Sequence, residues 1–186
     1  MDRPPRLLVV DLEGTCCRDD SIPREERETI EIGAVLVDGE TLAPTDEFQT
    51  FVRPIAHPTL TPFCLELTSI TQSDVDGAEG FPSAFARLLA WTGPGDARFC
   101  SWGGYDRSQF RRDCARHGVE NPLDEGHLNL KERFSEVLGR RPHFGMKRAL
   151  ELCGLPLEGT HHRGLDDARN IARMLPFLLG ERPLPT

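Results

Sequence analysis

The sequence predicts an α/β fold, a mixed five-stranded sheet flanked by helices. Residues 6–11 are predicted to form a strand, because the continuous apolar run at 7–10 is typical of a central strand buried on both faces. A strand, a turn dipeptide and a second strand follow, and together they indicate a hairpin beside the first strand. The rest of the chain alternates short strand patterns with helical patterns. Strands that are first paired by a hairpin and then alternate with helices predict a mixed sheet.

Each further strand has its own signal. The hairpin pairs residues 29–37 with residues 46–54, because Asp38-Gly39 is a dipeptide that favours a turn after the first of them. The fourth and fifth strands are predicted at residues 97–102 and 127–130. Gly103-Gly104 ends the fourth strand before a helix begins, and Pro82 occupies the favoured first turn of an earlier helix. The predicted helices lie near residues 62–67, 72–76, 82–93, 105–118, 131–138, 145–153 and 163–179.

The chain length bounds the number of domains. With 186 residues, we expect one domain over residues 1–186, with its core at about 6–179 and Pro-rich ends that fray. No stretch approaches the roughly 18 consecutive apolar residues of a membrane helix, and the apolar run near the start is too short for a signal peptide. These patterns predict a cytoplasmic protein without membrane association, and none of them sets an oligomeric state.

Charge and cysteine usage narrow the function classes. Lysine and arginine number 22 against 30 aspartate and glutamate residues, and the net charge of −8 argues against broad, sequence-blind coating of nucleic acid. A nucleic-acid enzyme remains open, because bound divalent cations can supply positive charge where a phosphate must lie. The cysteines show no zinc-site spacing and are expected to be reduced, mostly buried thiols; a ligand or redox role stays open for Cys16 and Cys17.

Two carboxylates lie at the end of the first strand, in "LLVVDLEGT". Asp11 and Glu13 project from the same face about 7 Å apart, because side chains alternate across a strand. Gly14 lets another chain or a ligand approach the backbone closely. Such a pair in the crevice at the end of a sheet strand suits Mg²⁺ or Mn²⁺, although the pair alone also fits a solvated strand end.

A third carboxylate is indicated by the last helix. When residues 163–179 are placed on a helical wheel, the apolar side chains fill one half, and Asp167 lies among them close to Ile171 and Leu178. Asp166 lies on the polar half, where a solvated helix start explains it. A carboxylate on a buried face must be paired or bind a metal, so Asp167 is the candidate ligand. Asp106, in the first turn of its helix, is a weaker candidate, since the helix dipole alone favours an acid there.

These residues carry a family resemblance. The segments "VVDLEGT", "SWGGYD" and "HRGLDDARNIA" resemble the three motifs of the DEDDh superfamily of 3′→5′ exonucleases. In that pattern the first motif is Asp-x-Glu, the second ends in Asp, and the third is His, four residues, then Asp. The resemblance implies a ribonuclease H-like sheet and assigns metal and catalytic roles to Asp11, Glu13, Asp106, His162 and Asp167. Its spacing selects His162 over the rival His161, and Asp167 over Asp166, in agreement with the helical wheel.

Further segments resemble one branch of the superfamily. "DLEGTCC", "FVRP", "LTPFCLELTSITQSDVDGA" and "HLNLKERF" are similar to the Eri-type exoribonucleases, which trim the 3′ ends of small or structured RNAs. The resemblance implies a 3′→5′ exoribonuclease that acts on single-stranded or short RNA and releases nucleoside 5′-monophosphates. It also implies two Mg²⁺ or Mn²⁺ ions about 3.5–4 Å apart. Asp11 would bridge them, Asp106 would reach one through water, and His162 would accept the proton of the attacking water.

The resemblance implies contacts with the terminal nucleotide as well. Gly14 and Thr15 would touch its sugar, and Phe63, Leu67 and Ile70 would pack on its base, although core packing explains those three equally well. Trp102 would stack on a base, with a packed loop tryptophan as the alternative. Two sets of charged residues have no assigned role: Arg107, Arg111 and Arg112 either guide the phosphate backbone or form a solvated helix face, and Glu31 is structural or supports a metal ligand.

Three functions compete on this evidence. The first is the metal-dependent 3′→5′ exoribonuclease, whose partner is an RNA 3′ end. The second is a 3′→5′ DNA exonuclease or a proofreading-type polymerase subunit acting on single-stranded DNA, because the same five residues serve both substrates. "DLEGTCC" and "LTPFCLELTSITQ" favour RNA. The third is a catalytically silent binding module, and the intact five-residue set argues against it.

Overall fold

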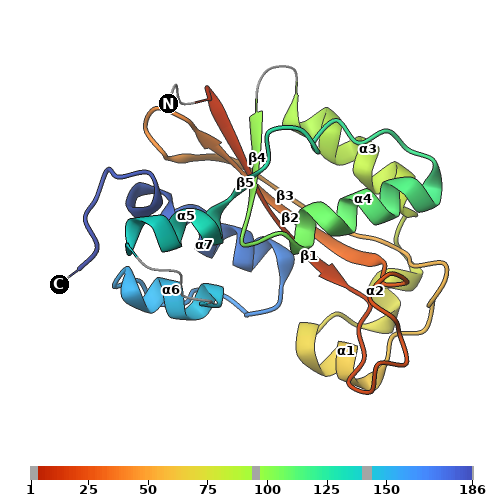
Figure 1. The fold of residues 1–186 in the computed structure, drawn as a ribbon. Coiled ribbons are helices and arrows are strands. Elements are labelled where there is room, and N and C mark those ends of the chain that lie inside the picture. Colours follow the sequence, from red (N-terminus) through yellow and green to blue (C-terminus); the bar gives the residue numbers. More distant parts are fainter. Residues whose placement is uncertain (1–3, 94–96, 140–143, 186) are drawn as a thin grey trace.

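The fold is that of a computed structural model, which describes residues 4–93, 97–139 and 144–185. A five-stranded sheet has helices on both sides (Figure 1). The strands are β1 Arg6–Gly14, β2 Thr29–Asp38, β3 Pro44–Phe51, β4 Ala97–Ser101 and β5 Leu128–Asn129. The helices are α1 Pro62–Thr68, α2 Gln72–Asp76, α3 Phe81–Thr92, α4 Tyr105–His117, α5 Leu130–Val137, α6 Met146–Leu152 and α7 Gly164–Leu178. None of the helices in these ranges is both long and apolar enough to cross a membrane.

The sheet is mixed, as predicted, with the order β3-β2-β1-β4-β5. β1 pairs antiparallel with β2, which pairs antiparallel with β3, so the first three strands are neighbours. On its other side β1 pairs parallel with β4, and β4 pairs parallel with β5. The α/β class and the central position of the first strand are therefore confirmed.

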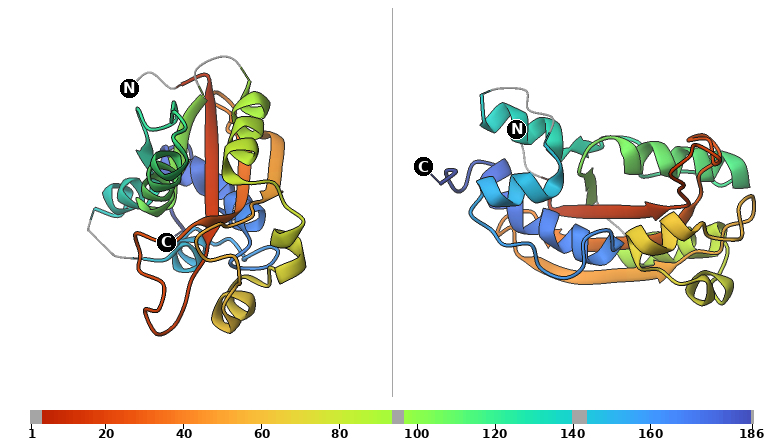
Figure 2. Two further views of the ribbon diagram at one scale, coloured as in Figure 1. Left: turned by 90° about the vertical axis from the view of Figure 1, so that its right-hand side faces the viewer. Right: turned by 90° about the horizontal axis from the view of Figure 1, so that it is seen from below.

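The core has one layer on each face of the sheet. Leu7 and Val9 of β1 pack with α5, α6 and α7, whereas Leu8 and Val10 pack with α3 and α4. This alternation explains the continuous apolar run, because both faces of β1 are covered. A smaller cluster that includes Ile30 joins α1 and α2 to the sheet. These two helices lie beyond the C-terminal end of β1 in each view (Figures 1 and 2).

The boundaries differ from the prediction in two places that affect the site. β1 continues to Gly14, three residues past the predicted strand, because Glu13 still pairs with Glu31 of β2 and a bulge follows only at Gly14. β5 has two residues, because Asn129 caps the next helix: its side chain accepts hydrogen bonds from the backbone nitrogens of Lys131 and Glu132. The chain therefore turns helical one residue earlier than predicted.

A close crossing of α7 over β2 brings the last helix to the acidic end of β1. Gly33 is the ladder partner of Asp11, and a Cβ atom built on Gly33 would overlap the backbone of Gly164 and Leu165. A Cβ atom on Gly164 would in turn lie 2.9 Å from the carbonyl oxygen of Asp11. The absence of two side chains thus allows the start of α7 to lie against the sheet beside Asp11.

Replacing Gly33 by alanine is expected to destabilise the fold by about 3 kcal/mol, the upper end of the range for overpacking a rigid contact. The overlapped atoms are backbone atoms, so no side-chain rotation relieves the clash. Chemical denaturation measures the loss. The control is Gly77→Ala, since Gly77 has a right-handed helical backbone and its added Cβ would meet only one oxygen at 3.5 Å. Equal stability of the two variants would contradict the tight crossing.

Candidate active site

Three carboxylates from two elements meet at the end of β1. One oxygen atom from each of Asp11, Glu13 and Asp167 lies within 4.8 Å of the others. Glu13 and Asp167 are 8% and 4% exposed, and Asp11 is half-buried. The alternation of side chains along β1 directs Asp11 and Glu13 to one face, and the crossing at Gly33 brings Asp167 of α7 to them. Asp166, by contrast, pairs with Arg169 at the surface, as the helical wheel predicts.

The electrostatics of this group favour a bound cation. Burial raises the pKa of Asp11 well above its ordinary value, and the charges of Asp106, Glu13 and Asp167 raise it further. Burial and the charge of Asp167 do the same to the pKa of Glu13. Three buried carboxylates that repel one another offer hard oxygen ligands and lack only positive charge, which is the requirement of a site for a divalent cation. The residues therefore fit the metal that the sequence predicts.

Asp106 lies beside this group without joining it. Its Oδ1 accepts a hydrogen bond of 3.0 Å from the backbone nitrogen of Leu12, so α4 is tied directly to β1 between the two acids of the strand. Burial raises the pKa of Asp106 to about 6, and the hydrogen bond from Leu12 partly offsets that rise. Gly103, with φ of 105°, turns the chain into α4 so that Asp106 falls in its first turn. Action through water remains the prediction for this residue.

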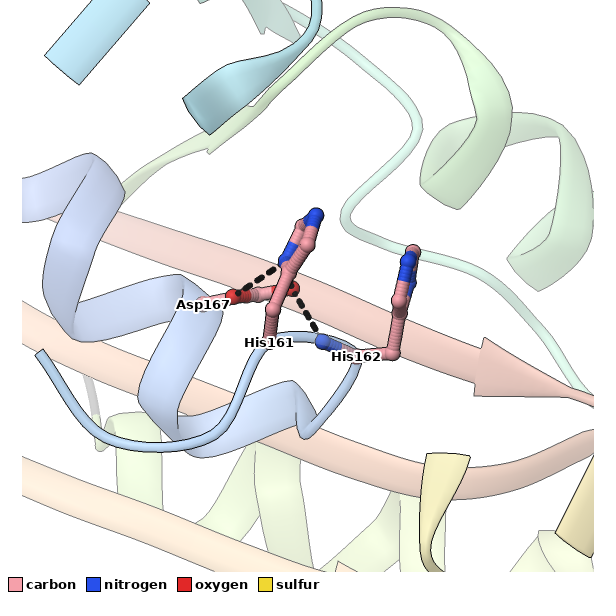
Figure 3. Close-up of side chains that lie close together, drawn as sticks. All are labelled: His161, His162 and Asp167. Carbon is pink, nitrogen blue, oxygen red and sulfur yellow. Dashed lines mark hydrogen bonds and ion pairs between the residues drawn. The ribbon is translucent and has the colours of Figure 1, made fainter. Parts of the chain in front are cut away.

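The two adjacent histidines have different roles toward Asp167 (Figure 3). The ring of His161 bonds the carboxylate, with 2.9 Å between Nδ1 and Oδ2. His162 instead donates its backbone nitrogen to the same oxygen, at 3.0 Å, and its ring stacks on that of His161 with 4.0 Å between the centroids. The left-handed backbone of His162, with φ of 64°, leaves its imidazole unbonded to the carboxylate. His161 thus holds Asp167 in place, a contact that the sequence did not predict.

The protonation of His162 suits a proton acceptor. Burial lowers its pKa from the ordinary value, and the charge of His161 lowers it further, whereas Asp167 opposes the change. The imidazole of His162 is therefore neutral at neutral pH. A neutral ring beside a carboxylate that could hold a metal suits general-base catalysis.

Glu31 explains how the loop that carries the histidines is fixed. Its carboxylate is fully buried, pairs with Arg163 at 3.2 Å, and accepts the backbone nitrogen of Gly164 at 2.9 Å. Gln49 of β3 donates to the same group. Glu31 therefore anchors the first residues of α7 to β2, which is the structural role that the sequence left open. The ion pair with Arg163 spans more than a hundred residues, and no local pattern signals it.

For two predicted base contacts, the structure shows the packing that the sequence offered as the alternative. Ile70 is 1% exposed and belongs to the apolar cluster of Ile30, Leu60 and Cys64, so it is core and does not line an open site. Trp102 packs on Phe134, and its indole nitrogen donates to the carbonyl oxygen of residue 144 at 3.3 Å, so it is a packed loop tryptophan. Phe63 and Leu67 are half-buried on α1, and nothing in the structure assigns them a ligand.

The two residues predicted to touch the sugar, Gly14 and Thr15, are packed against other parts of the protein. A Cβ atom on Gly14 would lie 2.5 Å from the hydroxyl of Tyr105, so the glycine leaves room for this tyrosine. Thr15 is 1% exposed, and its hydroxyl oxygen accepts a 3.0 Å hydrogen bond from the backbone nitrogen of Glu28. Tyr105, which the sequence analysis did not select, is the side chain that lies against the end of β1.

The cysteines match the reduced state that the sequence predicts. All six are free: Cys17, Cys64, Cys100, Cys114 and Cys153 are buried, and Cys16 is half-buried. A hydrogen bond from the thiol of Cys16 lowers the pKa of Cys64 to about 7. This pair lies near Glu13, but neither thiol belongs to the clusters that could hold a metal among the described residues.

Divalent metal is expected to stabilise the protein, and to do so more at about pH 8 than at about pH 5. The pKa of Asp106 is about 6 in the folded chain against an ordinary 3.8, so its contribution to stability is present below pH 3.8 and is lost as the pH rises through 6. The metal restores that loss, by about 2.7 kcal/mol at 100 times its Kd, or roughly 5–10 °C in melting temperature. Thermal denaturation with Mg²⁺ or Mn²⁺ measures the rise. An equal rise in Asp11→Asn would place the metal elsewhere.

The fold and the site together define a class of protein. A mixed five-stranded sheet carries an acidic pair on its central strand, a third acid on its last helix with a histidine pair in the loop before that helix, and a fourth acid bonded to the central strand. This arrangement is the ribonuclease H-like fold with a DEDDh nuclease site. The chain belongs to the exonuclease family, since the family model described as Exonuclease (RNase_T) matches residues 8–175.

Relatives and solved structures agree with this membership. The chain is 31% identical to mouse 3′-5′ exoribonuclease 1 over 183 residues, which cover 93% of this chain and 52% of that protein. It is 30% identical to human ERI1 exoribonuclease 2, covering 89% of this chain and 27% of that protein. The chain thus spans about half of the first relative and less of the second. The nuclease domain of 3′hExo, a DEDDh family member bound to rAMP, superimposes with a TM-score of 0.88 and 28% identity, covering 98% of this chain and 96% of that one.

Proposed function

We propose that this chain is a metal-dependent 3′→5′ exoribonuclease that removes nucleoside 5′-monophosphates from single-stranded or short RNA. The observation that carries the proposal is the sharing of Asp167 between two clusters: it completes the carboxylate group with Asp11 and Glu13, and it is bonded by the loop of His161 and His162. A cation site and a neutral imidazole are thereby held side by side, as hydrolysis of a phosphodiester requires.

The metal requirement is assigned to the acidic residues. Asp11, Glu13 and Asp167 would hold one Mg²⁺ or Mn²⁺ ion, and Asp11 with Asp106 would hold a second, the latter through water. When bound, such cations supply positive charge that offsets the charge developing on the attacking and leaving oxygens. The backbone nitrogen of Leu12 holds Asp106 directly, whereas Glu31 acts on Asp167 only through the start of α7 that it fixes.

His162 is assigned the proton transfer. Its neutral ring would take one proton from the attacking water as the water oxygen bonds to phosphorus. The bond from phosphorus to the 3′ oxygen of the preceding nucleotide breaks, and that oxygen gains a proton as it leaves. His161 keeps Asp167 in place during these steps through its 2.9 Å hydrogen bond.

The preference for RNA is supported by the relatives. Two of the most similar proteins are named exoribonucleases, and the 3′hExo nuclease domain was solved with rAMP. A DNA substrate is the competing proposal, since E. coli ExoI bound to single-stranded DNA has the same fold, with a TM-score of 0.74 and 14% identity. At that identity the likeness concerns the fold alone.

A short RNA and the matching DNA, each labelled at the 5′ end and incubated with Mn²⁺, test the proposal. A ladder that shortens from the 3′ end on RNA, and much more slowly on DNA, is the expected result. An RNA whose 3′ end is blocked should persist, because the terminal nucleotide is the site of attack. Equal digestion of the DNA would favour a DNA exonuclease. An RNA that stays intact with folded protein and metal would refute the exoribonuclease.

A further inference from the structure

Two arginines beside the site lack a charge partner. The Nε atoms of Arg27 and Arg112 are buried and have no hydrogen-bond partner. Within the part of the chain that the structure describes, neither guanidinium makes an ion pair with a carboxylate. Burial lowers the pKa of Arg112, whereas the charges of Tyr105 and Asp113 oppose that shift and those of Arg24 and Arg116 add to it. Partly buried cations without an ion pair are costly, so this arrangement favours a negatively charged ligand.

The two arginines are held together by Gln109 of α4. Its amide nitrogen donates to the carbonyl oxygen of Arg27 at 2.8 Å, and its amide oxygen accepts from the guanidinium of Arg112. Arg116, one turn further along α4, also donates to the carbonyl oxygen of Arg27, at 3.2 Å. The segment before β2 is therefore fixed along α4, so the backbone of Arg27 and the guanidinium of Arg112 are both bonded to Gln109.

Tyr105 connects this pair to the active site. Its hydroxyl lies against Gly14, directly after the acidic residues of β1. Burial and the charge of Asp106 raise the pKa of Tyr105, whereas the charges of Arg112 and Arg27 lower it. The phenol of Tyr105 thus interacts electrostatically with Asp106, Arg112 and Arg27, and its hydroxyl lies against the end of β1, so it links the two arginines to the carboxylate cluster.

The other candidate cations along α4 are already neutralised. Arg107 and Arg111 both pair with Asp124, at 3.0 and 2.5 Å. They line a cavity of about 760 Å³ along the short strand β5, whose lining also includes Leu7 and Leu179 and none of the four carboxylates. Of the three arginines that the sequence analysis set aside for backbone guidance, only Arg112 therefore retains an unpaired charge, and Arg27 joins it from a distant part of the sequence.

We propose that Arg27 and Arg112 bind a backbone phosphate of the substrate strand on the 5′ side of the bond that is cut. This inference rests on the proposed function. The scissile phosphate belongs at the carboxylates, so any further phosphate of a strand entering by its 3′ end lies upstream of it. Two guanidinium groups give a phosphate several charge-assisted hydrogen bonds in a fixed geometry. An acidic chain thereby gains one local contact that extends substrate recognition beyond the terminal nucleotide.

The test compares a substrate that has one phosphodiester with one that has several. Arg27→Gln, Arg112→Gln and the double variant are assayed with Mn²⁺ on a dinucleotide and on an RNA of about eight nucleotides, and kcat/KM is measured at several salt concentrations. On the longer RNA each substitution should cost about tenfold or more, the effect of a hydrogen bond to a charged group. The double variant should also flatten the dependence of log(kcat/KM) on log salt by about 0.7. On the dinucleotide, changes should stay below about twofold.

Arg111→Gln is the matched control, because Arg111 directly precedes Arg112 on α4 and is paired with Asp124. An equal loss in this control would place the strand in the cavity along β5 and overturn the proposal. Equal losses on the dinucleotide and the longer RNA would show that the arginines only support Tyr105, and would overturn the proposal as well.

A second pair of variants serves if circular dichroism shows that the glutamine variants do not fold. Arg27→Lys and Arg112→Lys keep the charge and should lose part of the excess of kcat/KM on the longer RNA over that on the dinucleotide. An unchanged excess would refute binding of the phosphate by the guanidinium groups. A wild-type chain inactive on both RNAs would instead refute the proposed function.

Discussion

Asp11→Asn is expected to abolish RNA hydrolysis while making the metal-free protein more stable. Asp11 stands in the middle of the acidic group: the charges of Asp106, Glu13 and Asp167 all raise its pKa, in addition to burial. An uncharged amide of nearly the same shape removes this repulsion and one costly buried charge. Each kcal/mol of relieved repulsion corresponds to roughly 2–4 °C in melting temperature for a chain of this size.

The same substitution removes the ligand that both proposed cations share. The loss in kcat is expected to reach at least about 10⁴-fold, the scale seen when a central member of a catalytic group is deleted. The metal-dependent rise in melting temperature should disappear with it. Activity assays with Mn²⁺ and thermal scans with and without metal measure the two effects on one protein sample. Opposite signs for stability and activity are the signature of a residue kept for chemistry rather than for folding.

Asp20→Asn is the control for this prediction, because Asp20 is exposed and the change in charge is identical. Its left-handed backbone, with φ of 58°, accepts asparagine readily. Neither stability nor activity should change appreciably. A metal-free Asp11→Asn protein that melts at a lower temperature than wild type would show that Asp11 is stabilised by a partner, and would contradict the repulsive cluster.

The sequence was sufficient for those parts of the site that follow from local periodicity. Asp11 and Glu13 share a face because strands alternate, and Asp167 is buried because it falls among apolar residues on the helical wheel. Both inferences use only neighbours in the chain. Asn170 shows the limit of the wheel: it falls on the polar half, yet it is fully buried, because its side chain bonds the backbone of Glu158 in the preceding loop.

Contacts between distant segments could not be predicted in this way. Glu31 and Arg163, or Arg27 and Gln109, meet only because the sheet order and the packing of the helices on it bring their elements together. Apolar residues near the site show a second limit. Ile70 lies in a motif associated with substrate, but an apolar side chain contributes to a core or to a binding surface with the same chemistry, and burial decides between them.

His162→Ala is expected to reduce kcat by about 10²–10⁴-fold, the usual contribution of a general base. His161→Ala should cost less, about 10–100-fold, because His161 acts on Asp167 and not on the reacting water. His161→Asn should recover much of that loss, since the amide can donate to Asp167 from a position close to that of Nδ1. Initial rates on the short RNA at saturating Mn²⁺ compare the three variants.

The dependence of activity on pH distinguishes the two histidines more sharply than the size of the loss in kcat does. A general base must be unprotonated, so activity falls as the pH drops through the pKa of His162, which burial and the charge of His161 place below the ordinary 6.5. Removing His161 exposes the ring of His162 and removes the positive charge that lowers its pKa. The charge of Asp167, which raises the pKa of His162, remains. The pKa of His162 should then rise, and the acidic limb of the profile should move to higher pH in His161→Ala.

The acidic limb should be absent in the residual activity of His162→Ala, because the group that titrates is gone. If the limb persists in His162→Ala and disappears in His161→Ala, the proton acceptor is His161. The proton would then go to Nε2 of His161, because its Nδ1 is bonded to the carboxylate of Asp167 in the structure. The DEDDh spacing favours the opposite assignment, in which the ring of His161 holds Asp167 and the stacked ring of His162 accepts the proton.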